Sequence, residues 1–140
     1  MSLRPFHIAI RVDDLASADS FYAGLLGADI GRRSNQWIDF DLYGHQVVVH
    51  LDESMDSPGE AANPVDGDHV PVPHFGIVFS IEEWRELAEK LRGADVDFII
   101  APRIRFEGQA GEQGTFFLRD PAGNALEFKG FRDMAQLFAS

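Results

Sequence analysis

The chain of 140 residues contains no cysteine. A disulfide framework, a thiolate metal site and a cysteine nucleophile are therefore all excluded. No apolar run is long enough to cross a bilayer, and the first residues lead into a strand pattern without the charged and then apolar segments of an export signal. We therefore expect a cytoplasmic protein without a membrane partner.

Basic residues are also few, since 12 Lys and Arg oppose 23 Asp and Glu for a formal net charge of -11. Nucleic acids and anionic membrane surfaces both bind basic protein faces. This charge balance argues against both as partners. A small molecule is the partner that we expect.

The pattern that fills the chain is a repeat of predicted elements: a strand, a helix and three further strands. The first copy spans about residues 4–52 and the second about residues 71–130. The letters support the duplication, because LLGADI at 25–30 matches LRGADV at 91–96. The sequence therefore predicts one α+β domain, in which two tandem βαβββ modules form a curved mixed sheet around a cleft.

The segments outside the two modules have simpler patterns. Residues 53–70 are rich in acidic residues, Pro, Gly and Ala without any period, which predicts an exposed connector. Residues 131–138 predict a short C-terminal helix. A longer loop is expected at Pro102–Gly114, after a short strand at Val96–Ala101.

Two helices are expected, one in each module. The first follows Asp13 or Asp14 and runs to about Leu26. The second begins with a capping box formed by Ser80 and Glu83, and Gly93 is expected to end it.

The strand Pro73–Phe79 places bulky apolar side chains on one face and His74 on the other. Gly76 shares the face of His74, and we interpret it as leaving room for an open site. His7 lies in the first strand of the first module, at nearly the same spacing from the matching letters as His74 in the second.

Alternation predicts that four possible metal ligands face away from the helices: His7, His50, His74 and Glu127. Imidazoles with one carboxylate suit a divalent metal such as Fe(II), Zn, Ni, Mn or Co, so the modules would enclose a metal-binding cleft. Each residue taken alone is also typical of a hydrogen-bonded or solvated strand side chain. Their matched places in the repeat favour a metal site.

Two further residues share this predicted orientation. Arg11 and Trp37 are candidate contacts for an anionic or aromatic substrate. Both residues could equally line the sheet without touching a ligand.

The repeated module, with PFHIAIRVDDL, PHFGIVF and FFLRDPAGNALEF, resembles the vicinal oxygen chelate superfamily. That group comprises glyoxalases, bleomycin and fosfomycin resistance proteins and extradiol dioxygenases. The segments WIDFDLYGHQVVVHL and RIRFEGQAGEQGTFF look most like small predicted extradiol-type dioxygenases. The resemblance covers nearly the whole chain.

The resemblance implies roles for particular residues. Metal ligands of the superfamily fall on His7, His74 and Glu127, and the ring-cleaving dioxygenases use this set for iron. His50 stands where glyoxalases usually carry a Glu or Gln ligand, so it is either an acid–base catalyst or a fourth ligand. Independently of the resemblance, we expect Arg105, Glu112 and Gln113 of the long loop to close over the substrate.

Three functions follow from the resemblance. The first is Fe(II)- and O₂-dependent ring cleavage of a catechol-like molecule. The second is a glyoxalase-like isomerase or lyase using Ni or Zn, and the third is a metal-free protein that binds a small drug or metabolite. A homodimer is expected, because small chains of this kind often pair.

Overall fold

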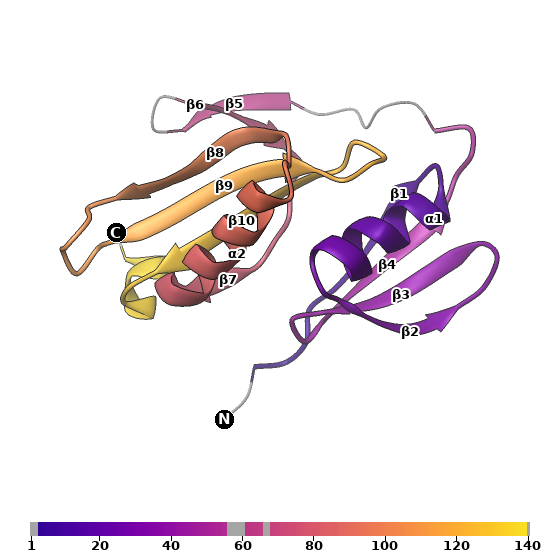
Figure 1. Ribbon diagram of the computed structural model, residues 1–140, viewed down its shortest axis with the longest axis horizontal. Coiled ribbons are helices and arrows are strands. Elements are labelled where there is room, and N and C mark those ends of the chain that lie inside the picture. Colours follow the sequence, from indigo (N-terminus) through magenta and orange to yellow (C-terminus); the bar gives the residue numbers. More distant parts are fainter. Residues whose placement is uncertain (1–2, 56–60, 66–67, 140) are drawn as a thin grey trace. The chain divides into compact units, whose positions relative to one another are not determined.

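The computed structural model describes residues 3–55, 61–65 and 68–139. The chain divides into two compact units, Met1–Gly59 with Asp120–Asn124, and Glu60–Arg119 with Ala125–Ser140. Each unit contains one mixed four-stranded sheet with a helix against it (Figure 1). The expected α+β class and the two βαβββ modules are confirmed, with one sheet in each module.

The first unit follows the predicted order of elements. They are β1 (His7–Val12), α1 (Leu15–Asp19), η1 (Ser20–Leu25), β2 (Asp29–Arg33), β3 (Trp37–Leu42) and β4 (His45–Leu51). The strands lie in the order β1-β4-β3-β2, with β1 parallel to β4 and the other pairs antiparallel. The sequence predicts one continuous helix in this unit, but only its first part, α1, is α-helical. The second part, η1, is a π-helix, and a 3.0 Å hydrogen bond from the Leu26 amide to the Phe21 carbonyl closes its last turn.

The core of the first unit lies between this helical segment and one face of the sheet. Tyr22 is fully buried and its ring lies 5.3 Å from that of Phe40. The Tyr22 hydroxyl donates a 2.8 Å hydrogen bond to Asp120, in the turn that belongs to this unit. Burial and the Asp120 carboxylate together raise the pKa of Tyr22 well above its ordinary value.

The second unit contains the other sheet, in the order β7-β10-β9-β8. Its elements are β5 (Ala61–Val65), β6 (Asp68–Val72), β7 (Val78–Ser80), α2 (Ile81–Gly93), β8 (Phe98–Arg105), β9 (Gln113–Arg119), β10 (Ala125–Phe131) and the 3₁₀ helix η2 (Met134–Phe138). β7 is parallel to β10, whereas β8, β9 and β10 are antiparallel.

Helix α2 covers one face of this sheet (Figure 1). The predicted N-cap at Ser80 is confirmed, because the Glu83 amide donates to the Ser80 hydroxyl; the Glu83 carboxylate accepts from that hydroxyl and not from the Ser80 amide of a full capping box. Trp84 packs onto Gly114 and Gly130, where a Cβ atom would come within 3 Å of its side chain, and donates its ring N–H to the Phe128 carbonyl. The opposite face of the sheet is thereby left for a cavity.

The structure corrects several predicted boundaries. Residues 61–65 and 68–70 of the expected connector, with 71–72 of the second module, form the hairpin β5–β6, while 56–60 and 66–67 lie outside the described residues. Strand β8 continues past Pro102, so the predicted loop is shorter at both ends. The predicted strand Pro73–Phe79 is regular only from Val78, with a single bridge at Phe75 before it.

The end of α2 also differs from the prediction. Gly93 is the last helical residue, and the left-handed conformation is adopted by Asp95, with φ of 61°. None of the described helices is both long and apolar enough to span a membrane.

Candidate functional site

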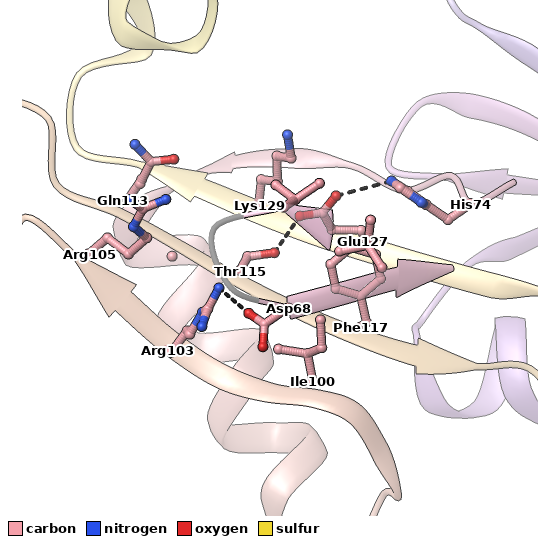
Figure 2. A pocket seen from close by; sticks show the side chains of 13 residues that line it. Asp68, His74, Ile100, Arg103, Arg105, Gln113, Thr115, Phe117, Glu127 and Lys129 are labelled. Atoms are coloured by element: carbon pink, nitrogen blue, oxygen red, sulfur yellow. Dashed lines mark hydrogen bonds and ion pairs between the residues drawn. The ribbon is translucent and has the colours of Figure 1, made fainter. Parts of the chain in front are cut away.

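A cavity of about 230 Å³ lies on the face of the second sheet that α2 does not cover. Strand alternation builds its wall, since Glu127 and Lys129 on β10 and Thr115 and Phe117 on β9 point to the same side. Strand β8 and the β5–β6 hairpin complete the lining (Figure 2).

His74 is held at this cavity by an unusually close approach between two chain segments. The Phe75 amide donates to the Ala125 carbonyl, and the Glu127 amide donates to the Phe75 carbonyl at 2.8 Å. A Cβ atom on Gly76 would lie 1.5 Å from the Glu127 carbonyl oxygen. The interpretation of Gly76 as leaving room for an open site is therefore wrong: the backbone of β10 occupies that space.

The imidazole of His74 has a defined hydrogen-bonding state. Its Nδ1 atom lies 2.6 Å from the Pro71 carbonyl oxygen, which can only accept, so Nδ1 carries a proton. Its Nε2 atom lies 3.2 Å from Oε1 of Glu127. The ring also packs edge-on against Phe117, at 5.0 Å between centroids. The orientation of His74 is thus fixed from three sides.

The carboxylate of Glu127 is held through Oε2, the oxygen that does not face His74. The Thr115 hydroxyl donates a 2.5 Å hydrogen bond to Oε2, which leaves Oε1 directed at His74 (Figure 2). The side chain of Glu127 is only 12% exposed and that of His74 is 28% exposed. A partly buried carboxylate with one oxygen already bonded is suited to offer the other to a cation.

The pair formed by His74 and Glu127 fits a divalent metal. With Nδ1 protonated, a neutral His74 presents a lone pair at Nε2 to a carboxylate oxygen, and only a proton or a cation makes that contact favourable. Two ligand atoms about 2.1 Å from a metal lie about 3.0 Å apart in octahedral and about 3.4 Å apart in tetrahedral geometry. The observed 3.2 Å lies between these values.

His74 and Glu127 offer two ligand atoms, fewer than the three or four protein ligands of a typical metal site. Within the described part of the chain, no group of three or more His, Cys, Asp or Glu side chains is placed to hold a metal. His7 and His50 belong to the first unit, on β1 and β4. Nδ1 of His7 lies 2.7 Å from the side-chain carbonyl oxygen of Gln46, just as Nδ1 of His74 faces the Pro71 carbonyl oxygen. His50 is exposed and lies opposite Trp37 in the sheet.

The two substrate contacts expected in the first unit have partners there. Arg11 forms an ion pair with Asp52 at 3.1 Å. The guanidinium of Arg32 lies 5.6 Å from the ring centroid of Trp37. Both contacts are typical of ordinary sheet residues.

The three residues expected on the long loop have different positions. Arg105 and Gln113 line the cavity, but as neighbours on the paired strands β8 and β9. Glu112 instead accepts from the Gly108 amide at 2.7 Å and from Arg85 at 3.2 Å, and it does not line the cavity. The Gly108 hydrogen bond, with Arg85, lowers the pKa of Glu112. Its carboxylate thus orders the β8–β9 connection.

Several cavity residues were not singled out from the sequence: Thr115, Phe117, Arg103, Asp68 and Lys129. Lys129 and Thr115 could have been found, because each lies two positions from a residue of the cavity wall on its own strand. Arg103 forms an ion pair with Asp68 of β6, which joins the hairpin to β8 (Figure 2). No sequence pattern predicted that hairpin.

Comparison with known proteins agrees with the fold. A glyoxalase/bleomycin resistance protein/dioxygenase from Alicyclobacillus acidocaldarius is 34% identical, with 96% of each chain covered and a TM-score of 0.76. At lower identity the likeness shows the fold alone. A lactoylglutathione lyase from Agrobacterium tumefaciens is 22% identical, covers 98% of this chain and 97% of its own, and has a TM-score of 0.67.

A genomically encoded fosfomycin resistance protein from Listeria monocytogenes is 16% identical, with 98% of each chain covered and a TM-score of 0.66. No curated protein sequence matches the chain. The family model that does match covers residues 4–128. The chain therefore belongs to the Glyoxalase/Bleomycin resistance protein/Dioxygenase superfamily.

Proposed function

We propose that this protein is a metal-dependent enzyme, and specifically an extradiol-type dioxygenase that uses Fe(II) and O₂ to cleave a catechol-like ring. The observation that carries the proposal is the His74–Glu127 pair, whose facing acceptor atoms lie 3.2 Å apart beside a cavity. The ligands would be His74, Glu127 and His7.

The surrounding residues support a metal role for the pair. The Pro71 carbonyl accepts from Nδ1 of His74, which leaves the lone pair of Nε2 available to a metal. Thr115 holds the carboxylate of Glu127. Such outer partners orient ligands, and the N–H that a histidine ligand donates also raises the basicity of its other ring nitrogen. His7 would have its Nε2 available for the same reason, since its Nδ1 pairs with Gln46. A bound metal would polarise substrate oxygens and lower the pKa of a coordinated hydroxyl group.

His50 is the candidate proton carrier in this proposal. Its imidazole can accept a proton from a substrate hydroxyl and return it later, which is the role of an acid–base catalyst. We keep the alternative that His50 is a fourth ligand. The homodimer and the cytoplasmic location expected from the sequence stay predictions.

The glyoxalase-like isomerase using Ni or Zn is the second candidate, because the same ligand pair would serve it. The metal-free binding protein is the third candidate. In that case His74 and Glu127 would form an ordinary ion pair, with a proton on Nε2.

Metal analysis and oxygen uptake separate these candidates. The protein is purified without a histidine tag, reconstituted anaerobically with Fe(II), and assayed for oxygen uptake with catechols, alongside His74→Ala and the control His69→Ala. His69 is an exposed histidine on β6 of the same unit. We expect about one iron per chain and oxygen-dependent turnover, both lost in His74→Ala and retained in the control.

The other outcomes contradict parts of the proposal. Turnover that needs nickel or zinc and proceeds without oxygen would replace the dioxygenase with the isomerase. Failure to retain iron, nickel or zinc would leave the binding protein as the better account.

A further inference from the structure

The cavity beside His74 is rich in cations, although the protein as a whole is strongly acidic. Three of its lining side chains are basic, namely Arg103, Arg105 and Lys129, and two are carboxylates, Asp68 and Glu127. The chain contains only 12 basic residues and has a net charge of -11. A concentration of cations at one concave site of an acidic protein attracts an anionic ligand.

The carboxylates of this cavity already have partners. Asp68 pairs with Arg103, so that charge is compensated within the wall. Glu127 accepts from Thr115 through one oxygen and faces His74 with the other. Within the described residues, the Lys129 ammonium has neither a hydrogen bond nor an ion pair, although the residue is half-buried at the cavity. Arg105 adds positive charge from β8.

The strand geometry sets the backbone spacing between Lys129 and Glu127, the carboxylate of the His74–Glu127 pair. Lys129 and Glu127 point to the same side of β10, two residues apart. Two residues of extended strand span about 6.6 Å. That length is about the width of a six-membered ring, so one small molecule can reach both groups.

We propose that Lys129 binds a carboxylate on the substrate, so that the substrate is a small ring-bearing acid anchored at Lys129 with its other end at His74 and Glu127. This inference rests on the proposed function for the role of that other end. The Lys129–carboxylate contact is a charge-assisted hydrogen bond made by a half-buried side chain, and such bonds are stronger in a low local dielectric. Binding itself needs no metal, and the inference can therefore be tested separately.

The chain offers a direct measurement because it contains two lysines, Lys90 and Lys129. Lys90 is exposed on α2 and serves as the internal control. Reductive methylation with ¹³C-formaldehyde labels both lysines and the amino terminus while keeping their positive charge. Loss of one NMR signal in Lys90→Met assigns the spectrum.

The probes are benzoate and its neutral analogue benzamide, added to the metal-free protein at neutral pH. We expect benzoate to shift the Lys129 signal saturably and to leave the Lys90 signal in place. Benzamide should bind more weakly than benzoate by a factor of about ten or more, because it lacks the negative charge. Lys129→Met should lower benzoate affinity about tenfold or more, whereas Lys129→Arg should restore most of it.

A static Lys129 signal, equal binding of the two probes, or unchanged affinity in a folded Lys129→Met protein would overturn the inference. If Lys129→Met does not fold, the Lys129→Arg variant provides the test. Loss of benzoate affinity in a folded Lys129→Arg protein, which keeps the positive charge, would also overturn the inference. Benzoate binding without metal binding would contradict only the proposed function. Metal binding without a benzoate response would contradict only the role of Lys129.

Discussion

Gly76 and Glu127 approach so closely that a Cβ atom on Gly76 would lie 1.5 Å from the Glu127 carbonyl oxygen. This contact is between backbones, so no side-chain movement can relieve it. It lies two residues from His74, and the backbone bonds of Phe75 to β10 flank it. The glycine thus allows the imidazole and the carboxylate to meet.

Replacement of Gly76 by Ala should therefore separate the ligand pair. We expect Gly76→Ala to destabilise the fold by about 2 kcal/mol or more and to weaken metal binding, because the segment must move away from β10. Urea unfolding and metal titration measure the two effects. Gly93→Ala is the control, since a Cβ atom there meets nothing within 4 Å and the residue is helical. Equal stability of the two variants would contradict the role of this contact.

Thr115 should affect metal affinity through Glu127. The variant Thr115→Val keeps the shape of the side chain but removes the hydroxyl that donates to Oε2. We expect a loss of about tenfold to a hundredfold in metal affinity. Thr115→Ser, which retains the donor, should lie close to the wild type. The idea fails if Thr115→Val binds metal as tightly as Thr115→Ser.

Glu112 should make stability depend on pH. Its folded pKa is lowered, mainly by the Gly108 amide and then by Arg85, so its contribution is fully present above the unfolded pKa, about 4.3 for an ordinary glutamate. That contribution is lost as the pH falls through the lowered folded pKa. Glu112→Gln should therefore be less stable than the wild type at pH 7, and the difference should shrink in acid. Melting temperatures of the variant and the wild type, measured from pH 7 down into acid, test this prediction.

The matched control for Glu112 is Glu86→Gln, which removes an exposed carboxylate on α2. It should differ little from the wild type at every pH. A Glu112→Gln protein with the same acid profile as this control would disprove the effect.

Tyr22 should keep its proton in alkaline solution. Its hydroxyl is buried and bonded to Asp120, and burial raises its pKa. The chain contains two tyrosines, so Tyr43→Phe leaves Tyr22 as the only phenol. Absorbance titration of that variant should show ionisation well above pH 10, or only on unfolding. Ionisation at the ordinary value would show that Tyr22 is solvated.

Loss of the Tyr22 hydroxyl should also cost stability. Tyr22→Phe removes a buried hydrogen bond, and we expect a loss of about 1 kcal/mol. Urea unfolding measures this loss. Asp120 retains three bonds, from the Ala122 and Asn124 amides and the Asn124 side chain, which limits the penalty. A stability equal to that of the wild type would contradict the contribution of this bond.

Strand alternation predicted the orientation of one residue of the candidate site. It placed Glu127 on the face away from α2, and His74 meets it there. The same alternation applied to β10 would have selected Lys129, but a lone lysine carries no metal chemistry and was passed over. The meaning of Gly76 could not be derived, because sequence does not show how near a neighbouring strand lies.

The β5–β6 hairpin was missed for a different reason. Pro64 and Pro71 interrupt any alternation in that segment, and β5–β6 is a two-stranded sheet separate from the other two. The sequence predicts that this strand ends before Pro102, because proline is a strand breaker. Strand β8 nevertheless continues to Arg105, since a proline is tolerated where the ladder is irregular. Nothing in the amino-acid sequence of η1 accounts for its π-helical conformation.

The central claim is that His74 and Glu127 bind a divalent metal, and anaerobic titration with Co(II) tests it most directly. The visible spectrum of Co(II) reports binding and ligand geometry without requiring turnover. The account predicts saturation at about one Co(II) per chain in the wild type and in His69→Ala, and a loss of about a hundredfold or more in affinity in His74→Ala and Glu127→Gln. Equal Co(II) affinity in all four proteins, or none in the wild type, would contradict it.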